Sequence, residues 1–526
     1  MPVSRRTHAR RFHGVHHVAT TVSMTEPLTR VRSPVLYQLN TRVRLAELKR
    51  ELGRPATLDD IPDSDLDALA AAGFDWLWLL GVWQTGKAGR EVARHHAELL
   101  AEFKRLLPDL TAADIPGSCF AIKGYHTGRE FGGNAALARI RKRLNKRGMR
   151  LLLDFVPNHT ALDHPWVHAH PDYYVQGSDD DLAVAPKNYW RQAPESPVFA
   201  HGRDPYFPGW TDTLQLNYAN PGTGRAMVAE LLRIAGQCDG VRCDMAMLIL
   251  PEVFARTWGL QMQPFWPEAI AAARHRYPDF LLMAEVYWDL EWELQQQGFD
   301  FAYDKRLYDR LRSGLASPVR DHLRAGFDFQ RRLARFLENH DEPRAAAIFS
   351  FAQHCAAAIV TFLSPGLRFF HNGQSDGYRE HIPVQLNRGP VEYPDPQVQA
   401  FYARLRECLR LPALRDGDWQ LLDAHSAWAG NDSAAGFLVW SWVLNGEPRV
   451  LVTVNYAPSR GQSYVRLPWY EPGVGTVRIR DAMTPTVYDR DGSELAAPGL
   501  YLDLPAWGYH VFEIVRTAAV GKSAAR

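Results

Sequence analysis

The chain has few cysteines and no cysteine motif. Its five cysteines, among 526 residues, are odd in number and widely spaced, and none belongs to a Cys-x-x-Cys pair. This distribution argues against a disulfide framework and against a zinc site built on paired cysteines. Separated thiols are typical of a reducing compartment, so we predict a cytoplasmic protein.

Long apolar runs and an excess of charge of one sign are also lacking. The 60 basic residues nearly cancel the 59 acidic ones, which leaves a net charge of +1. Without a strong positive field, we expect no nucleic acid and no membrane surface as a partner. The longest apolar stretches, 77–82 and 356–363, are far shorter than the roughly 20 residues that a membrane-spanning helix needs. The sequence has no phosphate-binding loop or dinucleotide fingerprint, so we expect no nucleotide or redox cofactor.

The two ends of the chain lack hydrophobic periodicity. Residues 1–33 are basic but contain no apolar region of a secretory signal, and we predict a disordered leader, with Met24 as an alternative start to Met1. Residues 517–526 are predicted to form a disordered tail. Between these ends, a hydrophobic content of 46% can supply the cores of two or three domains.

From residue 34 onward, short apolar runs alternate with helical patterns. Such runs are typical of strands that are buried on both faces of a parallel sheet. They lie at 35–39, 74–81, 150–156, 240–244, 280–285, 299–303, 335–339 and 367–370. The helix candidates include 64–72, 135–146, 224–235 and 267–276. Eight alternations predict an α/β fold, a (β/α)₈ TIM barrel, whose active site lies where the strands end.

Two stretches depart from this alternation. Residues 160–213 are rich in proline, aspartate, histidine and aromatic residues and have no helical period, which predicts an inserted subdomain after strand 3. From 410 to 516 the period changes to two, and turn residues separate short runs, which predicts a C-terminal antiparallel β-sandwich. The catalytic barrel is therefore predicted in two parts, 34–159 and 214–409.

Polar clusters follow four of the predicted strands. In a barrel, such positions face one mouth. A single polar strand end is more often a solvated terminus, but four at the same mouth indicate a functional site. The clusters are Asp154 to His159, Arg242 to Asp244, Ala284-Glu285, and Glu338 to Asp341.

Two of the carboxyl groups have opposite predicted environments. Arg242 and Asp244 lie two apart on a strand and share a face, so the guanidinium should keep Asp244 ionised, as a nucleophile requires. Glu285 ends an apolar strand, and such surroundings raise the pKa of a carboxyl toward that of a general acid. This pair suits retaining glycoside hydrolysis, in which the two carboxyls lie about 5–5.5 Å apart.

In order and spacing, these clusters resemble glycoside hydrolase family 13, the α-amylase family, from about Tyr37 through the C-terminal sandwich. Further matching segments are 81–83, 131–133, 216–217 and 366–373. The resemblance implies that Asp244 is the nucleophile of a β-glycosyl-enzyme intermediate and that Glu285 is the acid and then the base. It also implies that Asp341 stabilises the distorted, oxocarbenium-like sugar.

The resemblance extends to positions that bind substrate. It implies that Arg242, His159 and His340 form hydrogen bonds with the sugar in the donor pocket. Asp154 matches the acid that supports the arginine. Tyr125 matches an aromatic residue that stacks on the apolar face of the same sugar.

The chain departs from the family pattern after the nucleophile. Family α-amylases often carry Lys and His there, where they help to hold calcium, but this chain has Met247 and Leu248. Asn158 alone matches a calcium ligand, so we predict no metal site, although relatives that bind calcium keep the question open. Bulky Met245, Met247 and Leu248 after the nucleophile, together with residues 286–288 (Val-Tyr-Trp) after the acid, also predict a tight, water-poor acceptor side. Such a side fits short oligosaccharides and can favour transfer over hydrolysis.

Three functional hypotheses follow. The leading one is a retaining hydrolase of α-linked glucans or gluco-oligosaccharides of maltodextrin size. The alternative is a transglycosylase or a glucoside isomerase, like trehalose-forming relatives, that uses the same carboxylates. A remote third is a non-catalytic glycan-binding member of the fold. The sequence leaves the oligomeric state open.

Overall fold

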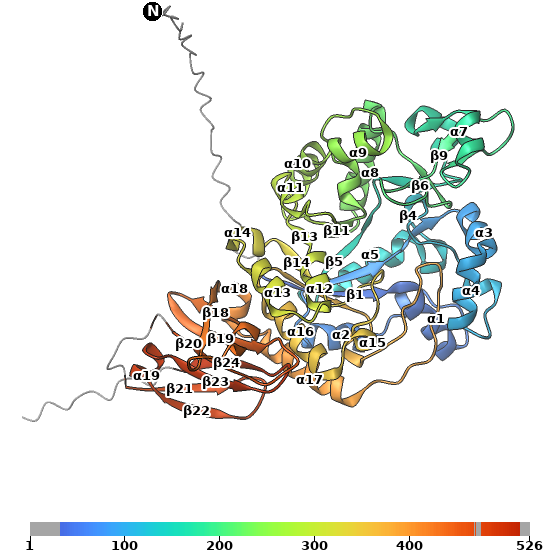
Figure 1. Ribbon diagram of the computed structural model, residues 1–526. Helices are drawn as coiled ribbons and strands as arrows, with labels where there is room; N and C mark the ends of the chain where they lie inside the picture. The colour runs from blue at the N-terminus through green and yellow to red at the C-terminus, as the bar shows by residue number, and fades with distance from the viewer. Residues whose placement is uncertain (1–31, 468, 470–474, 516–526) are drawn as a thin grey trace, which may run out of the picture. The chain divides into compact units, whose positions relative to one another are not determined.

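The computed structural model describes residues 32–467, 469 and 475–515 (Figure 1). The predicted tail and all but residues 32–33 of the predicted leader lie outside the described residues. Across the described part of the chain, each helix is too short or too polar to span a membrane.

Eight parallel strands close into a barrel, in the order β1-β15-β14-β13-β12-β11-β5-β2. The strands are β1 Val35–Asn40, β2 Trp76–Leu80, β5 Arg150–Phe155, β11 Gly240–Cys243, β12 Leu281–Ala284, β13 Phe301–Tyr303, β14 Leu333–Arg335 and β15 Leu367–His371. All five residues of β2 are buried, as a parallel strand covered on both faces requires. The barrel predicted from the alternating pattern is confirmed.

The position of the seventh strand was predicted wrongly. The apolar pattern placed it at 335–339, but β14 covers only Leu333–Arg335. Phe336 and Leu337 are buried although they lie beyond the strand, so their apolar character mimics a strand that continues. Glu338 to Asp341 therefore belong to the loop that follows β14.

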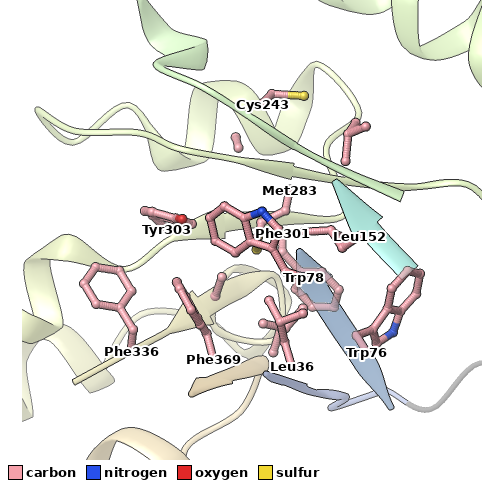
Figure 2. Close-up of a cluster of buried hydrophobic side chains, with 14 of the residues drawn as sticks. Leu36, Trp76, Trp78, Leu152, Cys243, Met283, Phe301, Tyr303, Phe336 and Phe369 are labelled. Carbon is pink, nitrogen blue, oxygen red and sulfur yellow. The ribbon is translucent and has the colours of Figure 1, made fainter. Parts of the chain in front are cut away.

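The interior of the barrel is filled by large side chains. Figure 2 shows Leu36, Trp78, Met283 and Phe369 among the residues packed there. The rings of Trp78 and Phe369 lie 5.5 Å apart between centroids. This packing closes the barrel below its mouth, so a substrate can approach only at the strand ends.

The helices of the barrel begin at residues suited to capping. Asn220 accepts a hydrogen bond from the backbone of Gly222 and Pro221 occupies the first turn of α8, a pairing favoured at helix starts. Ser350 caps α16 (Phe351–Leu363) in the same way. The four helix candidates are found as α2 Asp63–Ala71, α5 Gly133–Asn145, α8 Pro221–Ala235 and α10 Trp266–Arg276.

A long excursion between β2 and β5 was not predicted from the sequence. It contains β3 Trp83–Thr85, α3 Lys87–His95, α4 Ala97–Leu106 and β4 Ile122–Thr127. The strands β3 and β4 pair with each other, with irregular register. This excursion matters for the site because β4 carries Tyr125.

The segment that follows β5 forms small sheets. β6 (His159–Ala161) pairs with β10 (Thr213–Gln215), which brings the two ends of the segment together. Between them lies a three-stranded sheet, β7-β9-β8. The remaining elements are α6 Trp166–Ala169, β7 Gln176–Gly177, α7 Asp179–Val184, β8 Tyr189–Trp190 and β9 Val198–Ala200. The exact boundaries of this and the other domains stay a prediction.

The C-terminal strands form the predicted β-sandwich. A six-stranded sheet, β16-β18-β19-β24-β21-β22, faces a three-stranded sheet, β17-β20-β23, around a shared apolar core. The indoles of Trp440 and Trp442 both donate hydrogen bonds to the carbonyl of Leu363, at 3.0 and 2.9 Å. These bonds provide partners for a carbonyl group at the C-terminal end of α16. The strands are β16 Asp418–Leu422, β17 Ala424–Ser426, β18 Phe437–Leu444, β19 Glu447–Asn455, β20 Gly461–Val465, β21 Thr476–Asp481, β22 Val487–Asp491, β23 Leu500–Leu504 and β24 Tyr509–Val515.

Candidate active site

Three carboxyl groups converge on one buried guanidinium at the mouth of the barrel. Arg242, in β11, is 1% exposed. It pairs with the carboxylate of Asp244, and its Nη2 lies 2.8 Å from Glu285 Oε1 and 3.9 Å from Asp341 Oδ2. Asp244 and Glu285 directly follow β11 and β12, and Asp341 lies in the loop after β14, so the barrel brings the three acids to one mouth.

The backbone register explains why Asp244 and Glu285 are neighbours. Cys243 and Ala284 are paired at the ends of β11 and β12, so the next residue of each strand lies at the same level. The amide of Glu285 donates to the carbonyl of Cys243 at 3.0 Å and extends the ladder by one step. Met245 then turns the chain with a φ of +44°, and its amide donates to Glu285 Oε2 at 2.6 Å.

The surroundings of Glu285 favour its protonated form. Burial raises the pKa of Glu285 to about 8, although Arg242 opposes the rise. This is the direction expected from the apolar strand that precedes the residue. The hydroxyl of Tyr287 donates to Oε1 at 3.0 Å and fixes the orientation of the carboxyl group. At neutral pH, Glu285 can therefore hold a proton for transfer.

His340 and Asp341 lie in the loop after β14. His340 Nε2 is 3.2 Å from Asp341 Oδ2, and its Nδ1 is 2.9 Å from Gln38 Nε2. Burial and Arg242 lower the pKa of His340, so the imidazole is neutral. The side chain of Asp341 is 40% exposed, which leaves it open to a molecule that enters the mouth.

Asp154 is held at the end of β5, beside Arg242 in the strand register. Its two oxygens accept from Trp78 Nε1 at 3.1 Å and from the amide of Gly81 at 2.8 Å. Burial raises the pKa of Asp154 to about 7, while the charge of Arg242 lowers it. Asp154 is thus fixed by Trp78 and Gly81, and its support of Arg242 stays a prediction.

His159 and Tyr125 complete the predicted set. His159 is buried, and its ring lies 5.2 Å from that of Trp210. The hydroxyl of Tyr125 donates to the carbonyl of Val156 at 3.0 Å, and the Tyr125 ring packs on the edge of Trp83. Both residues border the end of β5, which places them near Asp154. Their contacts with a sugar stay a prediction.

The donors around Asn158 do not fit a calcium ion. Asn158 Oδ1 accepts a hydrogen bond from Gln215 Nε2 at 3.0 Å, so a neutral amide occupies the place where a cation would bind. Calcium requires six to eight oxygens, several of them from carboxylates. Among the described residues, no group of three or more His, Cys, Asp or Glu side chains is arranged to hold a metal.

The part of the predicted acceptor side that rests on Met247 and Leu248 is wrong. Met247 and Leu248 are buried in the apolar core and do not line an open surface. The left-handed turn at Met245 leads into a short 3₁₀ turn, Ala246–Ile249, that folds these side chains inward. Of these three residues after the nucleophile, only Met245, which is half-buried, can border the mouth.

The sequence analysis missed two aromatic residues that shape the site. Trp78 contacts Asp154 through its indole, meets His340 edge-on at 5.5 Å and lies 5.6 Å from the Arg242 guanidinium. Tyr303, at the end of β13, lies 5.8 Å from the same guanidinium. Figure 2 shows both rings inside the barrel. The alternation of inward and outward positions along β2 could have indicated Trp78.

Sequence comparisons match the chain to α-amylases. The model of the α-amylase catalytic domain matches residues 120–307. An α-amylase of Haloarcula japonica is 24% identical over 422 residues, which cover 76% of this chain and 54% of that protein. A maltosyltransferase of Pseudomonas aeruginosa that is named for α-1,4-glucan and maltose-1-phosphate is 30% identical over 176 residues, 32% of this chain and 24% of that protein. The chain spans about half the length of the α-amylases that it matches.

Solved structures show the same architecture. An α-amylase of Lactobacillus plantarum aligns over 92% of this chain and 99% of its own, with a TM-score of 0.65 and 20% identity. This likeness establishes the shared fold. The catalytic-domain match and the sequence relatives make this chain similar to the α-amylase family, glycoside hydrolase family 13, with the subfamily unassigned.

Proposed function

We propose that the protein is a retaining glycosidase that hydrolyses α-linked glucans or gluco-oligosaccharides of maltodextrin size. The convergence of Asp244, Glu285 and Asp341 on Arg242 carries this proposal. The α-amylases and the maltase among the sequence relatives support the same class of substrate.

In the first step, a carboxylate oxygen of Asp244 attacks the anomeric carbon while the bond to the leaving oxygen breaks. Glu285 gives its proton to that oxygen, and the product is a covalent glycosyl-enzyme. Arg242 pairs with the carboxylate of Asp244 and holds it in position for the attack. The carboxylate of Asp341 stabilises the positive charge that develops on the sugar.

In the second step, Glu285 takes a proton from water, and the water oxygen attacks the anomeric carbon. The ester bond to Asp244 breaks, so both carboxyl groups return to their starting states. His159, His340 and Tyr125 are proposed to hold the sugar in place during both steps, because short distances and correct orientation contribute much of such a barrier reduction.

A transferase is the second candidate. The maltosyltransferase of P. aeruginosa shares a 176-residue segment at 30% identity, above the 24% of the H. japonica amylase. The same covalent intermediate serves both reactions, and a sugar hydroxyl replaces water in the second step.

The proposal is tested with a fluorinated α-glucosyl fluoride that forms the intermediate quickly and releases it slowly. Intact-protein mass should rise by one glycosyl unit, and peptide mapping should place that unit on Asp244. Asp244→Asn should show no adduct and should lower kcat by on the order of 10⁴ or more. End-labelled maltotetraose then separates the candidates, since a hydrolase gives only shorter sugars and a transferase also gives longer ones. An adduct on another residue would refute the assignment.

A further inference from the structure

A buried amide lies below the mouth of the barrel. Gln38, in β1, is fully buried, and in the strand register it lies beside Trp78 of β2 and His371 of β15. Leu36, two residues earlier in the same strand, points into the barrel (Figure 2). The side chain of Gln38 therefore points inward as well, one layer closer to the mouth. This position lets the amide reach His340, in the loop after β14.

The two ends of the Gln38 amide each bind one histidine ring. Gln38 Nε2 lies 2.9 Å from His340 Nδ1, and Gln38 Oε1 lies 2.8 Å from His371 Nδ1. Burial lowers the pKa of both histidines well below its usual value, so each imidazole is neutral and carries one ring proton. Because an amide donates at one end and accepts at the other, the protonation of one ring is coupled to that of the other.

Two arrangements satisfy both hydrogen bonds, and the carboxylate of Asp341 favours one of them. If the Gln38 nitrogen donates to His340 Nδ1, the ring proton of His340 lies on Nε2. If the amide is turned round, Nδ1 carries the proton and Nε2 presents a lone pair. His340 Nε2 lies 3.2 Å from Asp341 Oδ2, where a proton is attracted and a lone pair is repelled. The proton therefore lies on Nε2.

The N–H of His340 is held ready for an acceptor. Among the described residues, the buried Nε2 has no hydrogen-bond partner, because the geometry of the nearby Asp341 oxygen forms no bond. The imidazole is flanked by Trp78 and by Phe120, just before β4, at 5.5 and 5.4 Å between ring centroids. These rings limit its rotation. An oxygen that enters the mouth, such as a sugar hydroxyl, can then accept the hydrogen bond.

We propose that Gln38 is a positioning residue that holds His340 in the tautomer protonated on Nε2, with this N–H available to the substrate. Gln38 acts through His340 and is not itself a catalytic residue. His371 supports it, because its Nδ1–H binds the end of the amide that accepts. A donor that is fixed in advance needs no reorganisation when the substrate binds. The effect on catalysis rests on the proposed function, whereas the tautomer does not.

The first test observes the ring of His340 by NMR in the full-length protein labelled with ¹⁵N-histidine. Such spectra distinguish a protonated ring nitrogen from one with a lone pair, and the signal that His340→Ala removes is the one assigned to His340. The unmodified protein should show a proton on Nε2 and a hydrogen-bonded lone pair on Nδ1. Gln38→Met has a similar size but cannot donate, so Nδ1 should lose the shift caused by that bond, and a population protonated on Nδ1 should appear.

Gln295→Met is the matched control for this spectrum. Gln295 is another buried amide, in α11 (Glu291–Gln296), and its side chain donates to the carbonyls of Phe329 and Arg332. Its removal should leave the His340 signal unchanged. If Gln38→Met does not fold, the unmodified protein still decides, because a proton on Nδ1 refutes the proposal and a proton on Nε2 with a hydrogen-bonded Nδ1 supports it.

The second test is a double-mutant cycle on kcat/KM for maltotetraose. Gln38→Met should lower kcat/KM by about tenfold, roughly 1.4 kcal/mol, as expected for one buried hydrogen bond. When His340→Ala is already present, Gln38→Met should change kcat/KM by less than about twofold, because its effect passes through that ring. Additive losses, or a His340 signal that Gln38→Met leaves unchanged, would overturn the proposal. If the unmodified protein does not act on maltotetraose, the proposed function fails, and the NMR spectra alone decide on Gln38.

Discussion

Replacing Tyr287 with phenylalanine removes one hydrogen-bond donor from Glu285 and leaves the ring in place. The Tyr287 hydroxyl donates to Oε1 at 3.0 Å, and burial raises its own pKa well above 10, so it stays protonated across the working range. A donor to a carboxylate stabilises the charged form and lowers the pKa of the acid. Its removal should therefore raise the pKa of Glu285.

The size of the shift follows from the strength of that bond. A hydrogen bond to a charged group contributes about 1.5–3 kcal/mol, and the half-buried position of Tyr287 favours the low end. Since one pKa unit corresponds to about 1.4 kcal/mol, the pKa should rise by about one unit. In the unmodified protein, burial raises the pKa of Glu285 to about 8, so activity should fall as pH rises through that value. In Tyr287→Phe the fall should begin about one unit higher.

The assay is the pH profile of kcat/KM on an aryl α-glucoside between pH 5 and 10. Tyr501→Phe, an exposed tyrosine in the C-terminal sandwich, is the control and should keep the original profile. An alkaline limb that stays in place, or that moves to lower pH, would show that Tyr287 does not tune the acid. It would also weaken the assignment of Glu285 to that limb.

Two further predictions concern stability and metal dependence. Asp304 is buried, but His322 and Arg335 overcome the effect of burial and lower the pKa of Asp304 to about 2. The ionised carboxylate therefore stabilises the folded protein above about pH 4, and this contribution is lost as pH falls toward 2. Asp304→Asn removes the charged partner of the buried Arg335 and should lower the free energy of unfolding, measured in urea titrations, by about 3–5 kcal/mol. Asp309→Asn, at an exposed ion pair, is the control and should lower the free energy of unfolding by under about 1 kcal/mol. A chelator should leave the melting temperature unchanged, because Gln215 already occupies the oxygen of Asn158. A large drop in the melting temperature on adding chelator would contradict this prediction and show that the protein binds calcium.

The barrel and the carboxylates at its mouth could be predicted, because each produces a local pattern in the sequence. A run such as Trp76–Leu80 can be covered on both faces only inside a parallel sheet, and a polar residue just past such a run must lie at the mouth. Asp244 and Glu285 follow this rule. Their proximity then needs only neighbouring strands in register.

Features that depend on a backbone turn or on tertiary contact could not be predicted. The Met247 side chain points into the core because the positive φ of Met245 turns the chain there. The hydrophobicity of these residues does not predict such a turn. The contact of Tyr206 with Trp288 joins segments 82 residues apart through an irregular loop. The end of β14 at Arg335 could not be predicted, because Phe336 lies beyond the strand but is as fully buried as a strand residue.

The most direct test of the central claim is the anomeric configuration of the first product, followed by proton NMR during cleavage of maltotetraose. A covalent intermediate on Asp244 inverts the anomeric centre twice, so the account predicts that the α-anomer appears first and mutarotates slowly toward equilibrium. If the β-anomer appears first, water attacks the substrate directly and Asp244 is no nucleophile. That result would contradict the account.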